Sequence, residues 1–186
     1  MRSTNFQKLL IVAALSICVL TSNSLFAQAT INADDLKAQM VKDWQRAKEY
    51  TDEYLSTMPA DKYGFKAVDS IRSFAQQMLH LSQANVNLIS AGTGKAKIFP
   101  DKLETITSAQ TADSVKYYVN ASYDYAIDAI SKLDAAKLGE KINLRNTELT
   151  RLTWINKAFE HQTHHRGQTT IYIRLLGIRP PGERLF

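Results

Sequence analysis

The side chains best suited to chemistry in this chain are its four histidines, His80, His161, His164 and His165. Successive residues of an α-helix are turned by about 100°, so residues four apart share a face. His161 and His165 can therefore direct their imidazole rings at one ion, whereas His164 points to a different side. Neutral imidazole is a common ligand of zinc and of other divalent transition metals. A metal site is therefore one hypothesis for this segment.

Other interpretations of the pair are open. A His-x-x-x-His pair also occurs as solvated or core histidines, and Glu160 precedes the pair, so the sequence does not form the His-Glu-x-x-His motif of zinc proteases. Two histidines are also fewer than the three protein ligands of a usual catalytic zinc site. His80 would have to complete the site from another helix, and its own helical stripe is either a polar cavity wall or a solvated face. That stripe contains Ser73, Gln76, Ala84 and Asn87.

Four helical segments are expected to position these residues. Apolar side chains recur at helical spacings over residues 34–56, 66–90, 111–132 and 147–176. The 7 glycines and 4 prolines favour long helices over a β-fold with many turns. The loop around Pro100 is long enough to carry a short helix or a functional group. Four amphipathic segments that each bury one face predict an all-α four-helix bundle.

The last segment contains the histidine pair and two features that oppose a helix. Gly167 lies in its middle, and the run 169–173 is β-branched enough to resemble a strand. We expect a helix from about Thr147, because nothing else in the chain offers a strand partner, with Gly177 just after its end. Trp154 shares the stripe of the histidine pair and is expected in the core.

The first residues have the order of a secretory signal peptide. Arg2 and Lys8 give a positive start, and an apolar run of about 12 residues follows over positions 9–20. That run is short of the roughly 20 residues needed to span a bilayer. A segment of small residues then ends with Ala27 and Ala29, either of which can precede the cleavage site.

Cleavage there would divide the chain into a signal peptide, residues 1–27, and one exported domain, residues 28–186, that is periplasmic or secreted and has no membrane span. The alternatives are an uncleaved anchor and a lipoprotein attached at Cys18. Because Cys18 is the single cysteine, a metal site in the mature domain must use His, Asp or Glu. The formal net charge of +5 is mild and the basic residues are scattered, so the sequence argues against a nucleic-acid partner.

Two stretches of the chain resemble the DinB family of DinB/YfiT-like proteins. Residues 72–85, with Phe74, Gln77 and His80, resemble the second helix of that family. The last helix and tail of the family are similar to His161-x-x-x-His165-Arg166-Gly167-Gln168, Tyr172-Ile173-Arg174-Leu175, Gly177 and Pro180-Pro181. The resemblance covers nearly all of the mature chain.

The resemblance implies an antiparallel-type four-helix bundle and a divalent metal, often zinc or nickel, held by three histidines. The matching positions in this sequence are His80, His161 and His165. The family includes transferases and isomerases that use low-molecular-weight thiols, and proteins without a known reaction. An export signal departs from the cytoplasmic members and would separate this protein from a cytosolic thiol.

We therefore expect an exported protein that binds a divalent metal through three histidines and acts as a thiol transferase-like or hydrolase-like enzyme on a small substrate, such as a thiol. Three neutral ligands leave open positions on the ion, which can lower the pKa of a bound water or thiol. Gln168 and Tyr172 are candidates to contact the metal ligands or the substrate, and their alternative role is packing. Arg166 is a candidate to bind an anionic substrate, and its alternative role is a surface charge.

Two further functions stay open from the sequence. The first is a metal- or ligand-binding protein of the cell envelope that performs no catalysis. The second is a helical interaction domain whose histidines are incidental. A homodimer is also compatible with the sequence, because helix bundles associate through exposed apolar stripes.

Overall fold

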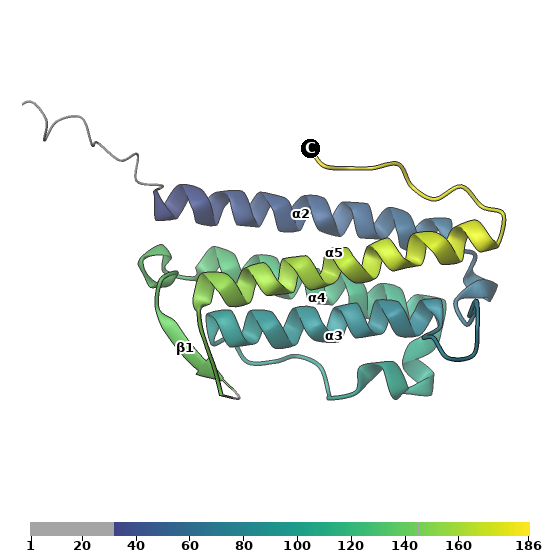
Figure 1. Ribbon diagram of the computed structural model, residues 1–186, viewed down its shortest axis with the longest axis horizontal. Coiled ribbons are helices and arrows are strands. Elements are labelled where there is room, and N and C mark those ends of the chain that lie inside the picture. The colour runs from purple at the N-terminus through teal and green to yellow at the C-terminus, as the bar shows by residue number, and fades with distance from the viewer. Residues whose placement is uncertain (1–31, 145) are drawn as a thin grey trace, which may run out of the picture. The chain divides into compact units, whose positions relative to one another are not determined.

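The computed structural model describes residues 32–144 and 146–186, which form a bundle of four long helices (Figure 1). The helices are α2 (Ala33–Thr57), α3 (Phe74–Thr93), α4 (Ala112–Lys132) and α5 (Arg151–Leu175). Short 3-10 turns are η1 (Ala60–Lys62), η2 (Leu103–Thr105), η3 (Thr107–Gln110) and η4 (Ala135–Lys137), and one antiparallel hairpin joins β1 (Lys141–Leu144) to β2 (Thr147–Thr150). The predicted four-helix bundle is confirmed. Within the described residues no helix is long and apolar enough to cross a bilayer, and the expected signal peptide, residues 1–27, lies outside them.

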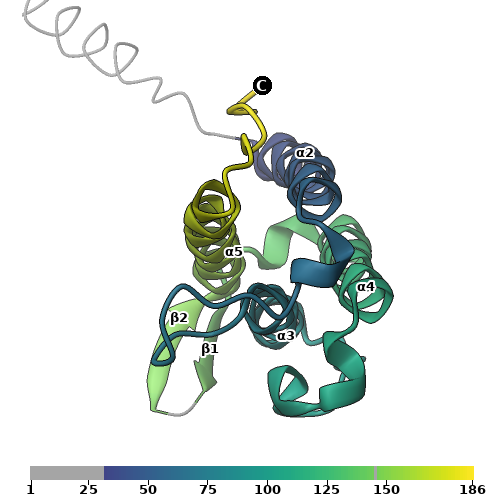
Figure 2. The ribbon, with the colours of Figure 1, turned by 90° about the vertical axis from the view of Figure 1, so that its right-hand side faces the viewer.

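The connection between α3 and α4 is long because these two helices run in the same direction. Helix α2 is diagonal to α3, and α4 is diagonal to α5, so α3 packs against both α4 and α5 (Figure 2). Asn85 bonds to Ser122, and Lys95 to Asp128, so α3 and α4 progress in parallel. Residues 94–111 must therefore return along the length of the bundle, and they carry η2 and η3 past the middle of α3. The expectation of short helices in this loop is confirmed.

Helix α3 begins later than the apolar periodicity predicts, at Phe74 rather than near Lys66. Ser73 starts it with a capping box: the Ser73 side chain accepts from the backbone N–H of Gln76 at 3.2 Å, and the Gln76 side chain accepts from the Ser73 N–H at 2.9 Å. This reciprocal cap satisfies two backbone donors and stops the helix from extending toward its N-terminus. The apolar residues before Ser73 instead lie in an irregular segment that covers the end of the bundle.

Helix α5 also begins later than predicted, and the expectation that the chain offers no strand partner is wrong. Residues 147–150 pair with 141–144, and Asn146 occupies the turn with a φ of 62°, a left-handed conformation that asparagine tolerates. Thr150 then caps α5 by accepting from the Thr153 N–H at 3.1 Å. The β-branched run 169–173 is helical, as predicted, because its inward side chains are buried in the bundle.

The two tryptophans of the chain lie in different environments. Trp44 is buried in the core, with its ring edge-on to Tyr123 at 5.7 Å and to Phe159 at 5.6 Å. Trp154 was expected in the core as well, but it is only half-buried and lines a cavity beside the hairpin. The hairpin covers part of α5 here, so the periodicity of α5 alone could not show what faces Trp154.

Candidate metal centre

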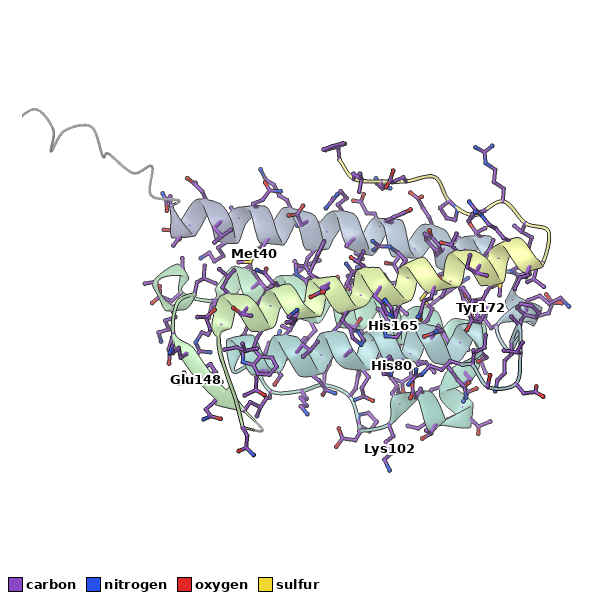
Figure 3. The ribbon with its side chains drawn as sticks, in the orientation of Figure 1. Met40, His80, Lys102, Glu148, His165 and Tyr172 are labelled. Atoms are coloured by element: carbon purple, nitrogen blue, oxygen red, sulfur yellow. The ribbon has the colours of Figure 1, made fainter. Side chains whose placement is uncertain are left out.

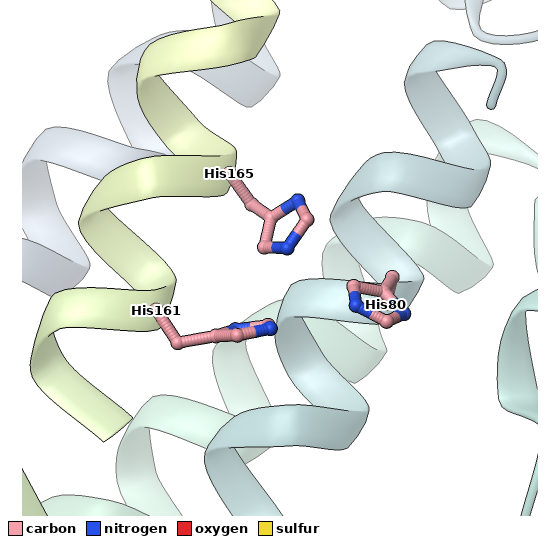
Figure 4. A group of neighbouring side chains, drawn as sticks. All are labelled: His80, His161 and His165. Atoms are coloured by element: carbon pink, nitrogen blue, oxygen red, sulfur yellow. The ribbon is translucent and has the colours of Figure 1, made fainter. Parts of the chain in front are cut away.

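Three histidines meet between α3 and α5, His80 from the first half of α3 and the other two from near the middle of α5 (Figures 3 and 4). The ring centroids of His80 and His161 are 5.2 Å apart, those of His80 and His165 4.6 Å, and those of His161 and His165 4.4 Å. One ring nitrogen from each residue lies within 4.8 Å of the others. This separation is somewhat wider than the about 3.3 Å between ligand nitrogens in a tetrahedral zinc site. Small side-chain rotations would therefore close the three rings on a single cation.

The fourth histidine does not join this group. His164 is exposed, and its Nε2 lies 3.1 Å from the Nε2 of Gln168. The one-residue offset from His165 turns its side chain to the edge of the α3–α5 interface, as the helical period predicts. The structure therefore brings His80 together with the His161–His165 pair and leaves His164 at the exposed edge of the α3–α5 interface.

Glu104, from η2 in the return loop, holds His80 in one orientation. The His80 Nδ1 lies 3.0 Å from the Glu104 Oε2, so the ring donates this proton and keeps the lone pair on Nε2. Arg72 forms a bidentate contact with the same carboxylate, donating from Nε at 2.8 Å and from Nη2 at 3.1 Å. A carboxylate bonded to the outer nitrogen of a histidine is a common support for a metal ligand, because it fixes the tautomer and raises the basicity of the ring.

A chain of side-chain amides fixes His165 in the same way. The His165 Nδ1 donates to the Gln77 Oε1 at 2.9 Å, and the Gln77 Nε2 donates to the Gln168 Oε1 at 2.7 Å. Gln168 in turn donates to His164. Each amide has one bonded oxygen and one bonded nitrogen, so the direction of every bond is determined, and His165 also keeps its lone pair on Nε2. Gln168 thus holds the His165 ring in place through Gln77.

His161 differs from the other two because its Nδ1 is buried and has no hydrogen-bond partner among the described residues. Buried polar atoms are nearly always bonded, so an unbonded ring nitrogen within a group of three imidazoles fits a cation ligand. The donor set, three nitrogens of neutral rings, is one that zinc, nickel, copper and iron accept. The residues present therefore fit a divalent transition metal.

Burial keeps all three rings neutral. Desolvation, with smaller contributions from His80, His164 and Arg72, lowers the pKa of His161 to about 4. Desolvation and the neighbouring imidazoles lower the pKa of His165 to about 3. Burial and Arg72 also lower the pKa of His80, and Glu104 partly opposes them. At neutral pH the three lone pairs are consequently available, which a cation requires of its ligands.

A polar cavity of about 650 Å³ opens beside the histidines. Its walls come from α3, α5, the segment before α3 and the return loop, and they include Arg72, Gln77, Glu104, His165 and Gln168. Most of these side chains carry hydrogen-bonding groups, so the cavity suits a small polar molecule. Glu104 is the one carboxylate among its described lining residues, and Arg72 and His80 both engage it.

Arg166 does not contribute to this centre. It is buried on a different side of α5, where its guanidinium lies 4.5 Å from the centre of the Tyr50 ring and donates to the Gln162 Oε1 at 2.8 Å. Its neighbour His165 faces α3, and one step along a helix turns the side chain by about 100°. The structure therefore corrects both expectations for Arg166: it neither reaches the cavity nor lies on the surface.

Tyr172 acts at a distance from the histidines. Its ring is buried, and its hydroxyl donates to the backbone oxygen of Arg72 at 2.7 Å. This bond fixes the segment that presents the Arg72 side chain to Glu104. Tyr172 thus supports His80 through Arg72 and Glu104, and it is not among the described residues that line the cavity.

Sequence reasoning did not find Glu104, although it indicated the loop that contains it. The signal was the length of the segment between the second and third helices, which is greater than two adjacent antiparallel helices need. Gln77 was noted only through the family resemblance. Its amide lies one helical turn from His80, at a position where a polar side chain inside the bundle needs a bonding partner.

The fold and the histidine group define a class of protein: a four-helix bundle with three histidines between two helices that lie close enough to hold a metal ion. The sequence profile of the DinB family matches residues 27–184, so the chain belongs to the DinB family. No curated protein matches the chain at a significant level.

Solved structures of three bacterial proteins share this fold. A DinB-like protein from Bacillus cereus aligns with a TM-score of 0.67 and 18% identity, over 77% of this chain and 95% of its own. A DinB-like protein from Bacillus subtilis aligns with a TM-score of 0.56 and 17% identity, over 80% and 96%. A conserved protein from Enterococcus faecalis aligns with a TM-score of 0.60 and 20% identity, over 74% and 95%. At these identities the similarity shows the fold.

Proposed function

We propose that the protein is exported, binds a divalent transition-metal ion through His80, His161 and His165, and uses it on a small substrate. The proposal rests on the orientation and charge of the three imidazole rings. Glu104 fixes the His80 ring and Gln77 fixes the His165 ring through hydrogen bonds to Nδ1, and burial lowers the pKa of all three histidines so that the rings are neutral. Three protein ligands are the pattern of catalytic rather than structural zinc sites. Zinc and nickel are the metals we expect.

When bound, such an ion supplies Lewis-acid chemistry and makes a water or thiol nucleophile available near neutral pH. The chain's own residues then perform the other tasks. Glu104 and Gln77 hold the ligand rings in place, and the polar cavity binds the substrate beside them. Arg72, whose side chain is 40% exposed while it grips Glu104, can also attract a negatively charged group of the substrate.

The activity supported best is a thiol transferase-like or hydrolase-like reaction. Both need one nucleophile activated at the centre and one small electrophile placed next to it, which the open cavity permits. A screen would combine metal-loaded protein with small thiols and electrophiles, and with simple esters and amides. We expect turnover that His161→Ala abolishes and that Asn156→Ala, an exposed position on α5 outside the cavity lining, retains. Equal rates for wild type and His161→Ala in every combination would exclude catalysis at this centre.

A metal-binding protein without catalysis is the second candidate, and one observation favours it. Glu104, the carboxylate of the described cavity lining, already bonds to Arg72 and His80, so it is not free to act as a general base. This candidate predicts tight, reversible metal binding and no reaction in the same screen.

Metal content tests the shared part of both candidates. The purified protein would be compared by elemental analysis with His80→Ala, His161→Ala and His165→Ala, and with His164→Ala as the matched control on the same helix. We expect about one equivalent of metal in the wild type and the control, and a strong loss in the other three. Equal metal content in all five proteins would contradict the proposed ligand set.

A further inference from the structure

Gln83 lies on α3 one helical turn after His80, and its side-chain amide bonds to the return loop at two points. The Gln83 Nε2 donates to the backbone oxygen of Pro100 at 2.8 Å, and the Gln83 Oε1 accepts from the backbone N–H of Leu103 at 2.7 Å. A primary amide both donates and accepts, so one side chain serves both backbone groups. These groups belong to the first and fourth residues of a four-residue turn, which the amide therefore spans.

The turn that Gln83 spans has an unfavourable backbone conformation. Lys102, on the return loop (Figure 3), has a φ of 59° and a ψ of 40°, which is the left-handed region that residues with a Cβ atom rarely adopt. Such a conformation persists where the surrounding contacts hold it in place. The two bonds from Gln83 lie on either side of Lys102, and Leu103 is fully buried. The amide is therefore well placed to stabilise this turn.

The residue that follows the turn is Glu104, which bonds to His80. Leu103 and Glu104 are consecutive in the loop, and their partners Gln83 and His80 are three residues apart on α3, where they share a face. The two contacts thus close a ring of hydrogen bonds between the helix and the loop. Within this ring, the bond from Gln83 sets the level along α3 at which the Glu104 carboxylate meets the His80 Nδ1.

Two other residues hold Glu104, but they come from outside α3. Arg72 binds its carboxylate from the segment before the helix, and the Gln110 Nε2 donates to its backbone oxygen at 3.0 Å from η3. Gln83 instead belongs to the helix that carries the ligand. Its contact therefore relates the position of the loop directly to the His80 ring.

We propose that Gln83 is a positioning residue of the metal centre, which holds the turn so that Glu104 orients His80. This inference rests on the proposed metal function. Without the Gln83 amide the turn relaxes, Glu104 is bonded to His80 for less of the time, and the ring is free to change its orientation and tautomer. The cavity of about 340 Å³ that all three residues line gives the ring room to do so.

A double-mutant cycle tests whether Gln83 acts through Glu104. Competition with a coloured chelator would measure the zinc affinity of the wild type, Gln83→Met, Glu104→Gln and the double variant. Methionine is similar in length to glutamine and cannot donate. We expect Gln83→Met alone to bind zinc about fivefold more weakly, because Gln83 is one step further from the ligand than the carboxylate. When Glu104→Gln is already present, Gln83→Met should change the affinity by less than about twofold.

The tautomer of His80 provides a second measurement, which needs no metal. In ¹⁵N-labelled, metal-free protein near pH 8, where imidazoles are neutral, the ring nitrogen signals report which nitrogen carries the proton. His80→Ala assigns the signals. We expect the proton on Nδ1 in the wild type, and a shift toward the Nε2–H form in Gln83→Met and in Glu104→Gln. A wild type that binds no zinc would defeat the proposed function, and this measurement would still decide the role of Gln83.

Ser90→Ala is the matched control, because Ser90 also ties the return loop to α3. Its hydroxyl donates to the backbone oxygen of Lys95 at 2.7 Å, at the start of the loop and away from Glu104. We expect this variant to keep the zinc affinity and the His80 tautomer of the wild type. Gln83→Ala is a second variant at the proposed position, and urea unfolding would verify that each protein is folded.

The proposal would be overturned by wild-type zinc affinity and a wild-type His80 tautomer in both Gln83→Met and Gln83→Ala. It would also be overturned if Gln83→Met weakened zinc binding by the same factor with and without Glu104, because Gln83 would then act on the fold in general. A loss of affinity in Ser90→Ala as large as that in Gln83→Met would likewise show that any tether of the loop has this effect.

Discussion

His80 donates its Nδ1 proton to Glu104 at 3.0 Å, and the two residues come from separate elements of the chain, α3 and η2. This bond orients the one histidine that α5 does not supply. The other two are oriented relative to each other by the helical period alone. The geometry of the centre therefore depends on a loop as much as on the bundle.

Replacement of Glu104 by glutamine should weaken metal binding by about tenfold, because loss of such a carboxylate support usually costs tenfold or more in affinity. The His80 ring would lose its charged partner and Arg72 its bidentate contact. Competition with a coloured chelator would measure the affinity. Glu148→Gln, on the exposed hairpin, is the control and should bind metal like the wild type. Identical affinities in both variants would show that Glu104 does not support His80.

The metal should stabilise the folded protein. Binding to the folded state alone adds about 4 kcal/mol when the free metal is a thousandfold above its dissociation constant. Urea unfolding with excess zinc or nickel, and again after chelation, would measure this difference. His164→Ala should show the same gain and His161→Ala almost none. A gain of equal size in both variants would place the binding site elsewhere.

The metal-free protein should become less stable as the pH falls below about 6.5. In the unfolded chain the imidazoles take up protons near that pH, whereas in the folded protein burial lowers the pKa of His161 to about 4 and that of His165 to about 3. The unfolded state then binds more protons, so the free energy of unfolding decreases with acidification until the folded rings also titrate. Urea unfolding between neutral pH and about pH 5 would measure the slope. The double variant His161→Ala with His165→Ala should have a shallower slope than His164→Ala, and equal slopes would refute the explanation.

Arg166→Ala should reduce stability and leave metal content unchanged. The substitution removes the contact with the Tyr50 ring and the bond to Gln162, and loss of such a buried group costs about 2 kcal/mol. Thermal unfolding and elemental analysis would be measured on the same sample. Arg174→Ala, exposed on the same helix, should have little effect on either. If Arg166→Ala kept its stability but lost activity, the result would contradict this structural role and indicate that Arg166 binds the substrate.

Export should leave a mature protein that begins at Gln28 or Thr30. Expression of the full chain in a bacterium, followed by mass determination of the purified protein, would locate the cleavage after Ala27 or Ala29. Arg2→Glu with Lys8→Glu reverses the positive start and should leave the precursor uncleaved. A wild-type protein of full-length mass would contradict the signal peptide.

The sequence predicted the parts of this molecule that depend on local periodicity. The pairing of His161 with His165, and the exclusion of His164, follow from the turn of a helix. The placement of His80 came from the family resemblance, because which face of one helix meets another is a long-range property. The hairpin and the late start of α5 were missed because strands of four residues have almost no periodic signal. The burial of Arg166 was missed because the Tyr50 ring that covers it comes from another helix, α2, and the sequence does not show which helices pack together.

The parallel course of α3 and α4 has a consequence for how proteins with this arrangement can diversify. The return segment lies outside the helical framework, and surface connections accept insertions and exchanges that a packed helix rejects. Here that segment delivers Glu104 to a ligand ring. A change of loop would therefore alter the support of His80, and with it the proposed metal affinity, while the three histidines and the helices that carry them are inherited intact.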